Sequence, residues 1–270
     1  MSDVIDMLKA KIADFCKYTG EFKVNGNENY QIKFVDDIYE FVFEDDEAYA
    51  KELLSPQDIL YGLFYVANNG ELLLLIKIAD EVNILGTILH ELVHVYDFIA
   101  LAEKRNIHNY RKLQKDTFFV LWSEFHASYL MYKYFVELGK DNINPLDVAT
   151  EIRNKLGNYY DSSEKLDLQT AVNTTVRYYG QYMALQSQFP NDLNKHFQRF
   201  YFDRKFLKIY EFLWEHRKVE CIMRDMNLWI RILKNLENLQ YLLNRAWNVN
   251  GNMVLYDRNI CLHGGVYDIC

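Results

Sequence analysis

The sequence predicts an α+β protein, in which a small front region with a short antiparallel sheet and one long buried helix precedes an all-helical lobe. Strand-like patterns are confined to residues 30–78, whereas the apolar residues after Pro145 recur at helical spacing. Half of the residues are hydrophobic, and only 11 are Gly and 3 are Pro, so the chain can bury a large core and has few linkers. We therefore divide it into a front region, 1–140, and a helical lobe, 141–270, with an irregular C-terminal tail.

The first elements follow from local periodicity. Residues 3–17 predict an amphipathic helix, because their apolar residues fall on one helical face. Residues 30–35 and 38–43 have the composition of two short strands, with two aspartates between them as a turn. The acidic stretch 44–52 predicts the start of a helix that ends before Pro56.

A β-hairpin is predicted over residues 59–78. Its turn is Asn68-Asn69-Gly70, and these residue types tolerate the positive φ angles of tight hairpins. Asp80 is a candidate cap for a helix at about 82–104. A charged loop then leads to a second long helix at about 117–138.

The rest of the chain is predicted to be helical up to its tail. Apolar residues recur at three and four, with charges between them, in the segments 145–157, 164–188, 191–217 and 220–247. The tail, 250–270, is glycine-containing and is expected to be irregular or a short hairpin. Its Cys261, His263 and Cys270 have a spacing that supports a second metal site only weakly.

Charge and composition disfavour several classes of partner. The net charge is −8, so binding to nucleic acid would need a local basic patch. One basic cluster exists, and we interpret it as a solvated loop between helices; it consists of Lys104, Arg105, Arg111, Lys112 and Lys115. No stretch reaches the roughly 20 apolar residues of a membrane span. We expect no nucleic acid and no membrane as partners.

The termini and the cysteines point to the cytoplasm. The first 16 residues alternate charged and apolar side chains and lack the apolar centre of a signal peptide. The four cysteines contain no CxxC pair and form no dense framework, which is typical of reduced thiols. A cytoplasmic location is therefore predicted.

The motif that carries chemistry is His90-Glu91-Leu92-Val93-His94. Residues four apart on a helix are turned by only about 40°, so both imidazoles face one metal ion. Glu91 lies at the edge of the same face, where it reaches a metal-activated water as general base. The residues from Thr87 to Tyr96 around these three are uncharged, which predicts a buried helix. The alternative is a pair of satisfied core histidines beside a surface glutamate, but burying such groups without a partner is costly.

The flanks of the motif resemble the extended signature of zincin metallopeptidases, with Thr87 three residues before the first histidine and hydrophobic residues around it. Residues 59–78 are similar to the zincin edge strand, which pairs with extended substrate, and pairing at a sheet edge is a general mode of peptide recognition. In metzincins a glycine and a third ligand occupy the positions of Asp97 and Ala100, so that branch is excluded.

A glutamate on a following helix is the solution of the gluzincins, and Glu124 fits it. Glu124 is the only acid between Phe118 and Phe135, in an almost entirely apolar segment. A carboxylate there needs a cation, and a metal supplies one. Pairing with a Lys or Arg elsewhere is the alternative. His90, His94 and Glu124 are thus the predicted zinc ligands.

The Glu124-x-x-Ala127 arrangement resembles the gluzincin peptidases of the ImmA/IrrE type over residues 59–135, about a third of the chain. This resemblance implies a cytoplasmic zinc metallopeptidase, an enzyme that often acts on one specific protein, with region 1–140 as a zincin-like catalytic core. The long helical lobe departs from the family, so the substrate and its regulation are not carried over.

Three further predictions concern supporting residues. Asp97 lies on the metal face of its helix, where it can accept a hydrogen bond from a ligand imidazole; a cap or a salt bridge is an equal alternative. His126 is turned by about 200° from Glu124, so we interpret it as packing or as a partner for another helix. An oxyanion donor is also needed, and the candidates are Tyr178, Tyr179 and Tyr182.

Three functions compete for this motif. The first is hydrolysis of peptide bonds in an intracellular protein, for which an edge strand open to peptide is the expected sign. The second is a catalytically silent regulatory or interaction module, which would show a fourth protein ligand. The third is a hydrolase or effector acting on a non-peptide amide, which would show a narrow pocket in place of an extended groove.

Overall fold

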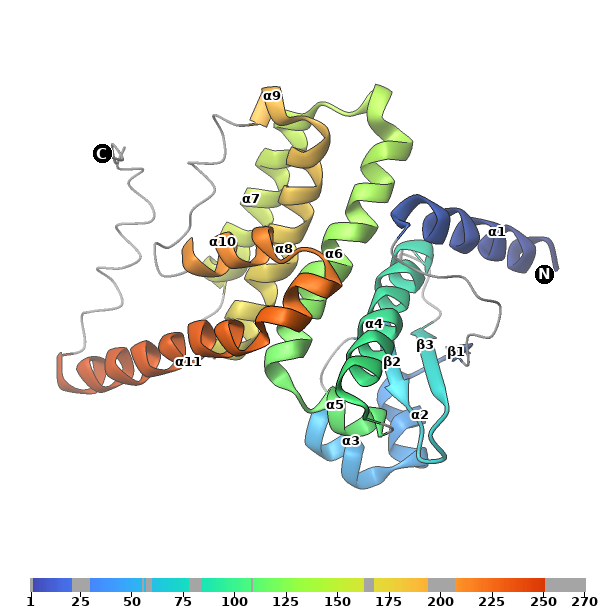
Figure 1. The fold of residues 1–270 in the computed structure, drawn as a ribbon, viewed down its shortest axis with the longest axis horizontal. Coiled ribbons are helices and arrows are strands. Elements are labelled where there is room, and N and C mark those ends of the chain that lie inside the picture. Colours follow the sequence, from blue (N-terminus) through green and yellow to red (C-terminus); the bar gives the residue numbers. More distant parts are fainter. Residues whose placement is uncertain are drawn as a thin grey trace. The chain divides into compact units, whose positions relative to one another are not determined.

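The computed structural model describes residues 2–20, 30–54, 56, 60–77, 84–107, 109–162, 168–193 and 207–250. The chain divides into two compact units, Met1–Asp141 and Asn142–Cys270. The α+β class is confirmed, because a small three-stranded sheet in the first unit is followed by helices (Figure 1). Asp80 and the tail after residue 250 lie outside the described residues.

The sheet consists of β1 (Tyr30–Val35), β2 (Gly62–Val66) and β3 (Leu72–Lys77), in the order β1-β3-β2. The predicted hairpin is confirmed, since β2 and β3 pair antiparallel. The sheet is mixed, however, and the expectation of a purely antiparallel sheet is corrected. β1 pairs parallel to β3, because the chain between them crosses over through two helices before returning.

The predicted strand at 38–43 is wrong, because these residues form helix α2 (Ile38–Asp45). Asp37, interpreted from sequence as part of a turn, is the N-cap of this helix: its carboxylate accepts a hydrogen bond of 3.0 Å from the backbone N–H of Glu40. The buried residues Ile38 and Val42 are four apart, which is helical spacing. Apolar residues occur on several sides of this short segment, so the spacing of its apolar residues does not distinguish a helix from a strand.

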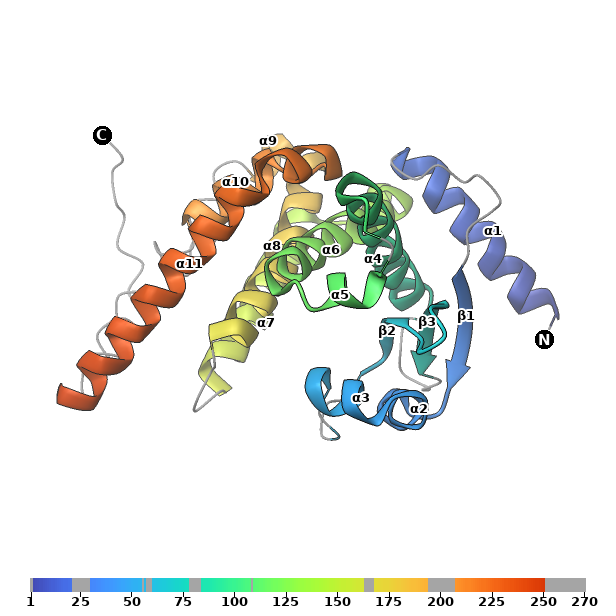
Figure 2. The ribbon, with the colours of Figure 1, turned by 60° about the horizontal axis from the view of Figure 1, so that its bottom comes forward.

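The two faces of the sheet are covered by different helices. Side chains alternate along β2, so that Tyr65 packs with Ile38 and Val42 on the face of α2 and α3 (Glu47–Leu53). Phe64 points the other way, and its ring centre lies 5.3 Å from that of Phe98 in helix α4 (Ile84–Arg105). Figure 2 shows this order of layers, with α4 on one side of the strands and α2 and α3 on the other.

Three more helices complete the first unit: α1 (Ser2–Thr19), α5 (Tyr110–Gln114) and α6 (Thr117–Gly139). Helix α6 packs along α4, and the ring centres of Phe119 and Phe98 lie 5.2 Å apart between them. Helix α1 is attached to α6, since the hydroxyl of Tyr134 donates a hydrogen bond of 2.8 Å to Asp14. The predicted helices at 3–17, 82–104 and 117–138 are thus confirmed to within two residues at each end.

Helix α4 is the element that carries the histidine motif. In the part of the chain that the structure describes, α4 is the one helix that is both long enough and apolar enough to cross a membrane. Its most apolar 18-residue window has a mean hydropathy of 1.4. Two thirds of that window, 67%, is buried inside the protein. The core helix of a globular unit has the same composition, so this apolar character reflects packing between the sheet and α6.

The described part of the second unit is helical, as predicted. It contains α7 (Pro145–Ser162), α8 (Leu168–Gln188), α9 (Pro190–Leu193), α10 (Leu207–Glu215) and α11 (Val219–Asn250). Where one helix was expected over 191–217, α9 ends at Leu193 and α10 begins at Leu207. The residues between them, 194–206, lie outside the described residues.

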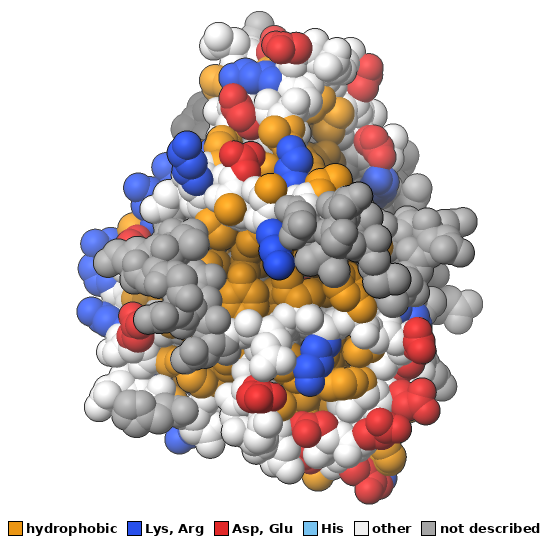
Figure 3. Space-filling view, turned by 90° about the vertical axis from the view of Figure 1, so that its right-hand side faces the viewer, with side chains coloured by type: hydrophobic (Ala, Val, Ile, Leu, Met, Phe, Trp, Pro, Cys, Tyr) orange, Lys and Arg blue, Asp and Glu red, His pale blue; other side chains and the backbone are white. Residues whose placement is uncertain are grey.

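One face of the surface carries a band of hydrophobic side chains across its middle, as Figure 3 shows. The large hydrophobic side chains that are exposed in the first unit include Met7 of α1 and Phe34 of β1. Apolar atoms form much of any folded surface, so this band by itself assigns no function.

We expect the substitution Asp37→Ala to lower the free energy of unfolding by about 1 kcal/mol, because α2 loses its N-cap. The hydrogen bond from Glu40 holds the pKa of Asp37 below its ordinary value of 3.8. The contribution is therefore present at neutral pH and is lost as the pH falls through the pKa of the folded state. Urea unfolding at several pH values measures it. The exposed Asp36→Ala is the control, and equal losses for both variants would contradict the assignment.

Candidate metal centre

The described residues bring His90, Glu91 and His94 into one group on α4. Their candidate ligand atoms all lie within 4.8 Å of one another, and all three side chains are buried. The Nε2 atoms of the two histidines are 3.2 Å apart, because a spacing of four residues places both rings on one face of the helix. The group has the HExxH spacing, and it could hold a metal ion.

The carboxylate of Glu124 reaches the same point from α6. Its Oε2 lies 3.2 Å from Nε2 of His90, and its Oε1 lies 3.7 Å from Nε2 of His94. The side chain of Glu124 is only 17% exposed, so its negative charge is mostly removed from water. The packing of α6 along α4 therefore brings together the three side chains that the sequence predicts as metal ligands.

These donors are close enough to one another to share one metal ion. Nitrogen and oxygen ligands about 2.0–2.1 Å from a tetrahedral zinc ion lie about 3.3–3.4 Å from one another. The closest approaches among His90, His94 and Glu124 are 3.2, 3.2 and 3.7 Å. Imidazole nitrogens with one carboxylate are also the donor set of many catalytic zinc sites. The identity of the metal is open to other divalent ions with the same preference.

A hydrogen-bonded chain orients the ring of His94. The single hydroxyl proton of Ser123 is donated to Asp97 at 2.6 Å, so its oxygen accepts from Nδ1–H of His94 at 2.8 Å. The proton of the neutral ring is then on Nδ1, and the lone pair of Nε2 faces His90 and Glu124. Burial lowers the pKa of His94, which favours this neutral form.

Asp97 also binds a second partner. Nδ1 of His126 lies 2.9 Å from its other oxygen, and the ring of His126 stacks on Trp122 at 4.8 Å. Asp97, His126 and Ser123 are at most 1% exposed, so their polar atoms depend on one another. Asp97 was predicted to accept a hydrogen bond directly from a ligand imidazole. In the structure the hydroxyl of Ser123 lies between Asp97 and the imidazole of His94.

Sequence reasoning missed Ser123 as the link between Asp97 and His94. The available signal was a small polar residue directly before Glu124 in an otherwise apolar helix. His126, interpreted from sequence as a partner for another helix, lies on α6 and contacts Asp97 of α4. Ser123 and His126 are three residues apart, so they share the face that meets Asp97.

Glu91, the predicted general base, lies against strand β2. Its Oε2 accepts a hydrogen bond of 2.8 Å from the backbone N–H of Phe64. Gly62 makes this approach possible, because a Cβ atom there would lie 2.4 Å from Cγ2 of Thr87 and 2.9 Å from Cγ of Glu91. Any side chain at this position would therefore force the side chains of Thr87 and Glu91 to shift. The sequence reasoning did not single out Gly62.

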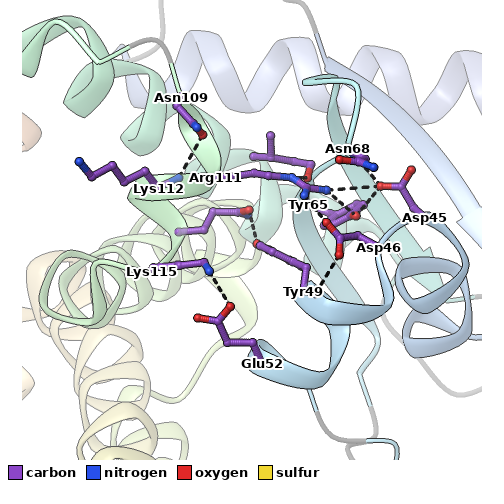
Figure 4. A network of polar contacts seen from close by, with 12 residues as sticks. Asp45, Asp46, Tyr49, Glu52, Tyr65, Asn68, Asn109, Arg111, Lys112 and Lys115 are labelled. Carbon is purple, nitrogen blue, oxygen red and sulfur yellow. Dashed lines mark hydrogen bonds and ion pairs between the residues drawn. The ribbon is translucent and has the colours of Figure 1, made fainter.

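The basic cluster runs from the last turn of α4 to the end of α5, and three of its side chains pair with acids. Arg111 contacts Asp46 at 2.5 Å, and the corresponding pairs of Arg105 with Asp116 and of Lys115 with Glu52 measure 3.1 and 2.5 Å. Figure 4 shows the part of this network around Arg111. The interpretation as a solvated loop needs adjustment, because the segment contains helix α5 and several of its charges are paired.

The predicted oxyanion residues belong to α8 of the second unit. Tyr179 and Tyr182 are each 1% exposed there, and Tyr178 is partly exposed. The hydroxyl of Tyr182 donates a hydrogen bond of 3.5 Å to the carbonyl of Leu193. Their role toward a substrate stays a prediction.

No family model, curated protein or solved structure matches this chain. What supports the resemblance to zincins is therefore the buried His90-Glu91-His94 group and its spacing.

We expect the chain to bind about one zinc ion. The substitution Glu124→Ala removes a charged ligand and should weaken zinc binding at least about tenfold. Competition with a chromophoric chelator measures the affinity. Glu137→Ala, which removes an exposed acid from the same helix, serves as the control. Unchanged zinc affinity in Glu124→Ala would remove Glu124 from the ligand set.

We expect Ser123→Ala to weaken zinc binding roughly 10- to 100-fold, because the substitution releases the imidazole of His94 from its preferred tautomer. Ser128→Ala is the matched control, since Ser128 is another buried serine of α6. Circular dichroism checks that both variants fold. If both variants bind zinc as tightly as the parent protein, the chain from Asp97 does not prepare the ligand.

Proposed function

We propose that this protein is a zinc-dependent metallopeptidase that hydrolyses peptide bonds of an intracellular protein in the cytoplasm. The observation that carries the proposal is that donor atoms of His90, His94 and Glu124 lie 3.2–3.7 Å from one another. Beside them is Glu91, whose carboxylate is held by the backbone N–H of Phe64. A structural site needs ligands, but it does not need an adjacent carboxylate held in a fixed position.

His90, His94 and Glu124 would hold the zinc ion. The ion supplies Lewis acidity, which lowers the pKa of water and polarises a carbonyl group. Glu91 accepts the proton of the attacking water and later delivers it to the leaving amine. The hydrogen bond from Phe64 orients the Glu91 carboxylate for this transfer. Tyr178, Tyr179 and Tyr182 remain the candidates for stabilising the oxyanion.

A non-peptide amide hydrolase is the second candidate, and one observation favours it. An extended peptide would need free backbone groups along the outer edge of β2. The carbonyls of Phe64 and Val66 on that edge accept hydrogen bonds from Gln114 and Arg111. A small amide would not need this edge. A peptide substrate is compatible with these hydrogen bonds if it pairs with only a short part of the β2 edge.

We expect the zinc-loaded protein to cleave unfolded protein or peptide, and Glu91→Gln to lower kcat/KM by about 10²- to 10⁴-fold, because general-base catalysis is lost. The variant should bind as much zinc as the parent. Glu103→Gln, an exposed substitution on the same helix, is the control. The assay follows new amino termini by mass spectrometry.

Two results would redirect the assignment. Full activity in Glu91→Gln would exclude Glu91 as the base. Tight zinc binding without cleavage of any peptide or small amide would favour the regulatory or interaction module.

A further inference from the structure

The outer edge of β2 is defined by its pairing with β3. Backbone hydrogen bonds from Lys77 N–H to Tyr61 and from Ala67 N–H to Glu71 flank the paired residues. In an antiparallel pair, the residues that bond to the partner strand alternate with residues whose N–H and C=O point outward. In this register the backbone groups of Phe64 and Val66 point away from β3. These are the groups that an added peptide strand would use.

Side chains of this protein already occupy that edge. The N–H of Phe64 donates to Glu91, and its carbonyl accepts a hydrogen bond of 2.8 Å from Nε2 of Gln114. Two residues further along, the carbonyl of Val66 accepts a hydrogen bond of 2.9 Å from Nε of Arg111. Helix α5 therefore covers the edge of β2 from Phe64 toward the end of the strand.

The two capping side chains are firmly held. Oε1 of Gln114 accepts a hydrogen bond from the hydroxyl of Tyr49. The guanidinium of Arg111 contacts Asp46 at 2.5 Å and the hydroxyl of Tyr65 at 3.1 Å, and it lies 4.9 Å from the centre of the Tyr49 ring. Figure 4 shows that these partners come from α3, β2 and the loop before α3.

These contacts favour a fixed position for Gln114 and Arg111 at the edge of β2 over a movable one. The side chain of Arg111 is only 20% exposed, so its contacts with Asp45 and Asp46 are partly shielded from water. Shielded, charge-assisted hydrogen bonds are stronger than exposed ones. A peptide that displaced Gln114 and Arg111 from the strand would take the carbonyl acceptors away from Nε2 of Gln114 and Nε of Arg111.

The covered part of the β2 edge begins next to the candidate metal centre, at Phe64. Glu91 contacts Phe64, and Val66 lies about 6.6 Å further along the strand at the usual rise per residue. Gly62 lies on the other side of Phe64, where the strand approaches Thr87 and Glu91 of α4. Among the residues that the structure describes, the side chains that bind the outer carbonyls of β2 lie at Phe64 and Val66.

We propose that Gln114 and Arg111 are specificity-determining residues that close the Val66 end of the substrate edge. An extended peptide then pairs with β2 on the Gly62 side, and only a few of its residues fit beyond the scissile bond on the closed side. The substrates are peptides cut close to one terminus, always the same one. This inference rests on the proposed peptidase function and names its substrate class.

The test is a ladder of synthetic peptides, each lengthened one residue at a time on one side of the cleaved bond. With the zinc-loaded protein, lengthening on the closed side should lower kcat/KM at least about tenfold, the effect of leaving a buried donor unpaired. Lengthening on the open side should not lower it. Gln114→Ala should reduce the penalty, and Tyr49→Phe, which releases Gln114, should act in the same direction. Lys112→Ala, an exposed substitution on α5, is the matched control.

A binding readout separates this inference from the proposed function. In the zinc-loaded Glu91→Gln variant, fluorescence anisotropy should show weaker affinity for peptides lengthened on the closed side, with relief in the double variant carrying Gln114→Ala. Two results together would contradict the role of Gln114 and Arg111 but not the proposed peptidase function. These are cleavage at internal and terminal positions alike, and the same dependence on peptide length in Gln114→Ala as in the parent protein. Absence of both cleavage and peptide binding would overturn the peptidase proposal and this inference with it.

Discussion

Asp97 and Ser123 are almost completely buried, and the hydrogen bond between them joins α4 to α6. A buried carboxylate destabilises the folded state unless its oxygens accept hydrogen bonds. The oxygens of Asp97 contact Ser123 and His126, which both belong to α6. This arrangement fixes how α6 lies along α4. The position of Glu124, next to Ser123 in the chain, follows from it. So does the orientation of the His94 ring, and the candidate metal centre depends on both.

The same helix α4 also sets the relation between the centre and the sheet. Gly62 lets β2 approach α4 so closely that Glu91 bonds to the backbone of Phe64. Helix α5 then returns to the same strand and binds its carbonyls through Gln114 and Arg111. The group that could hold a metal ion therefore lies beside a strand edge whose outer carbonyls are bound by the protein's own side chains. Under the proposed peptidase function, these side chains limit the length of substrate that can pair with β2.

The elements predicted best were those with strong and unambiguous local signals. The long helices α4 and α6 have consistent apolar spacing, and the hairpin has a turn rich in Asn and Gly. Helix α2 was mistaken for a strand because a short apolar segment fits either period, and because its N-cap Asp37 also resembles a turn residue. The parallel pairing of β1 was not foreseen, since a crossover leaves no mark on the strand itself.

The sequence by itself determined the chemical identity of the candidate centre. Spacing along one helix brings His90, Glu91 and His94 together, and an acid in an apolar helix marked Glu124 as a partner. Tertiary structure alone decided the roles of Ser123 and Gly62, and it also decided that α5 covers the edge of β2. The physical reason is that periodicity reports which residues share a face of one element. Hydrogen bonds between α4, α6, α5 and β2 depend instead on how separate elements pack, and no local pattern encodes that.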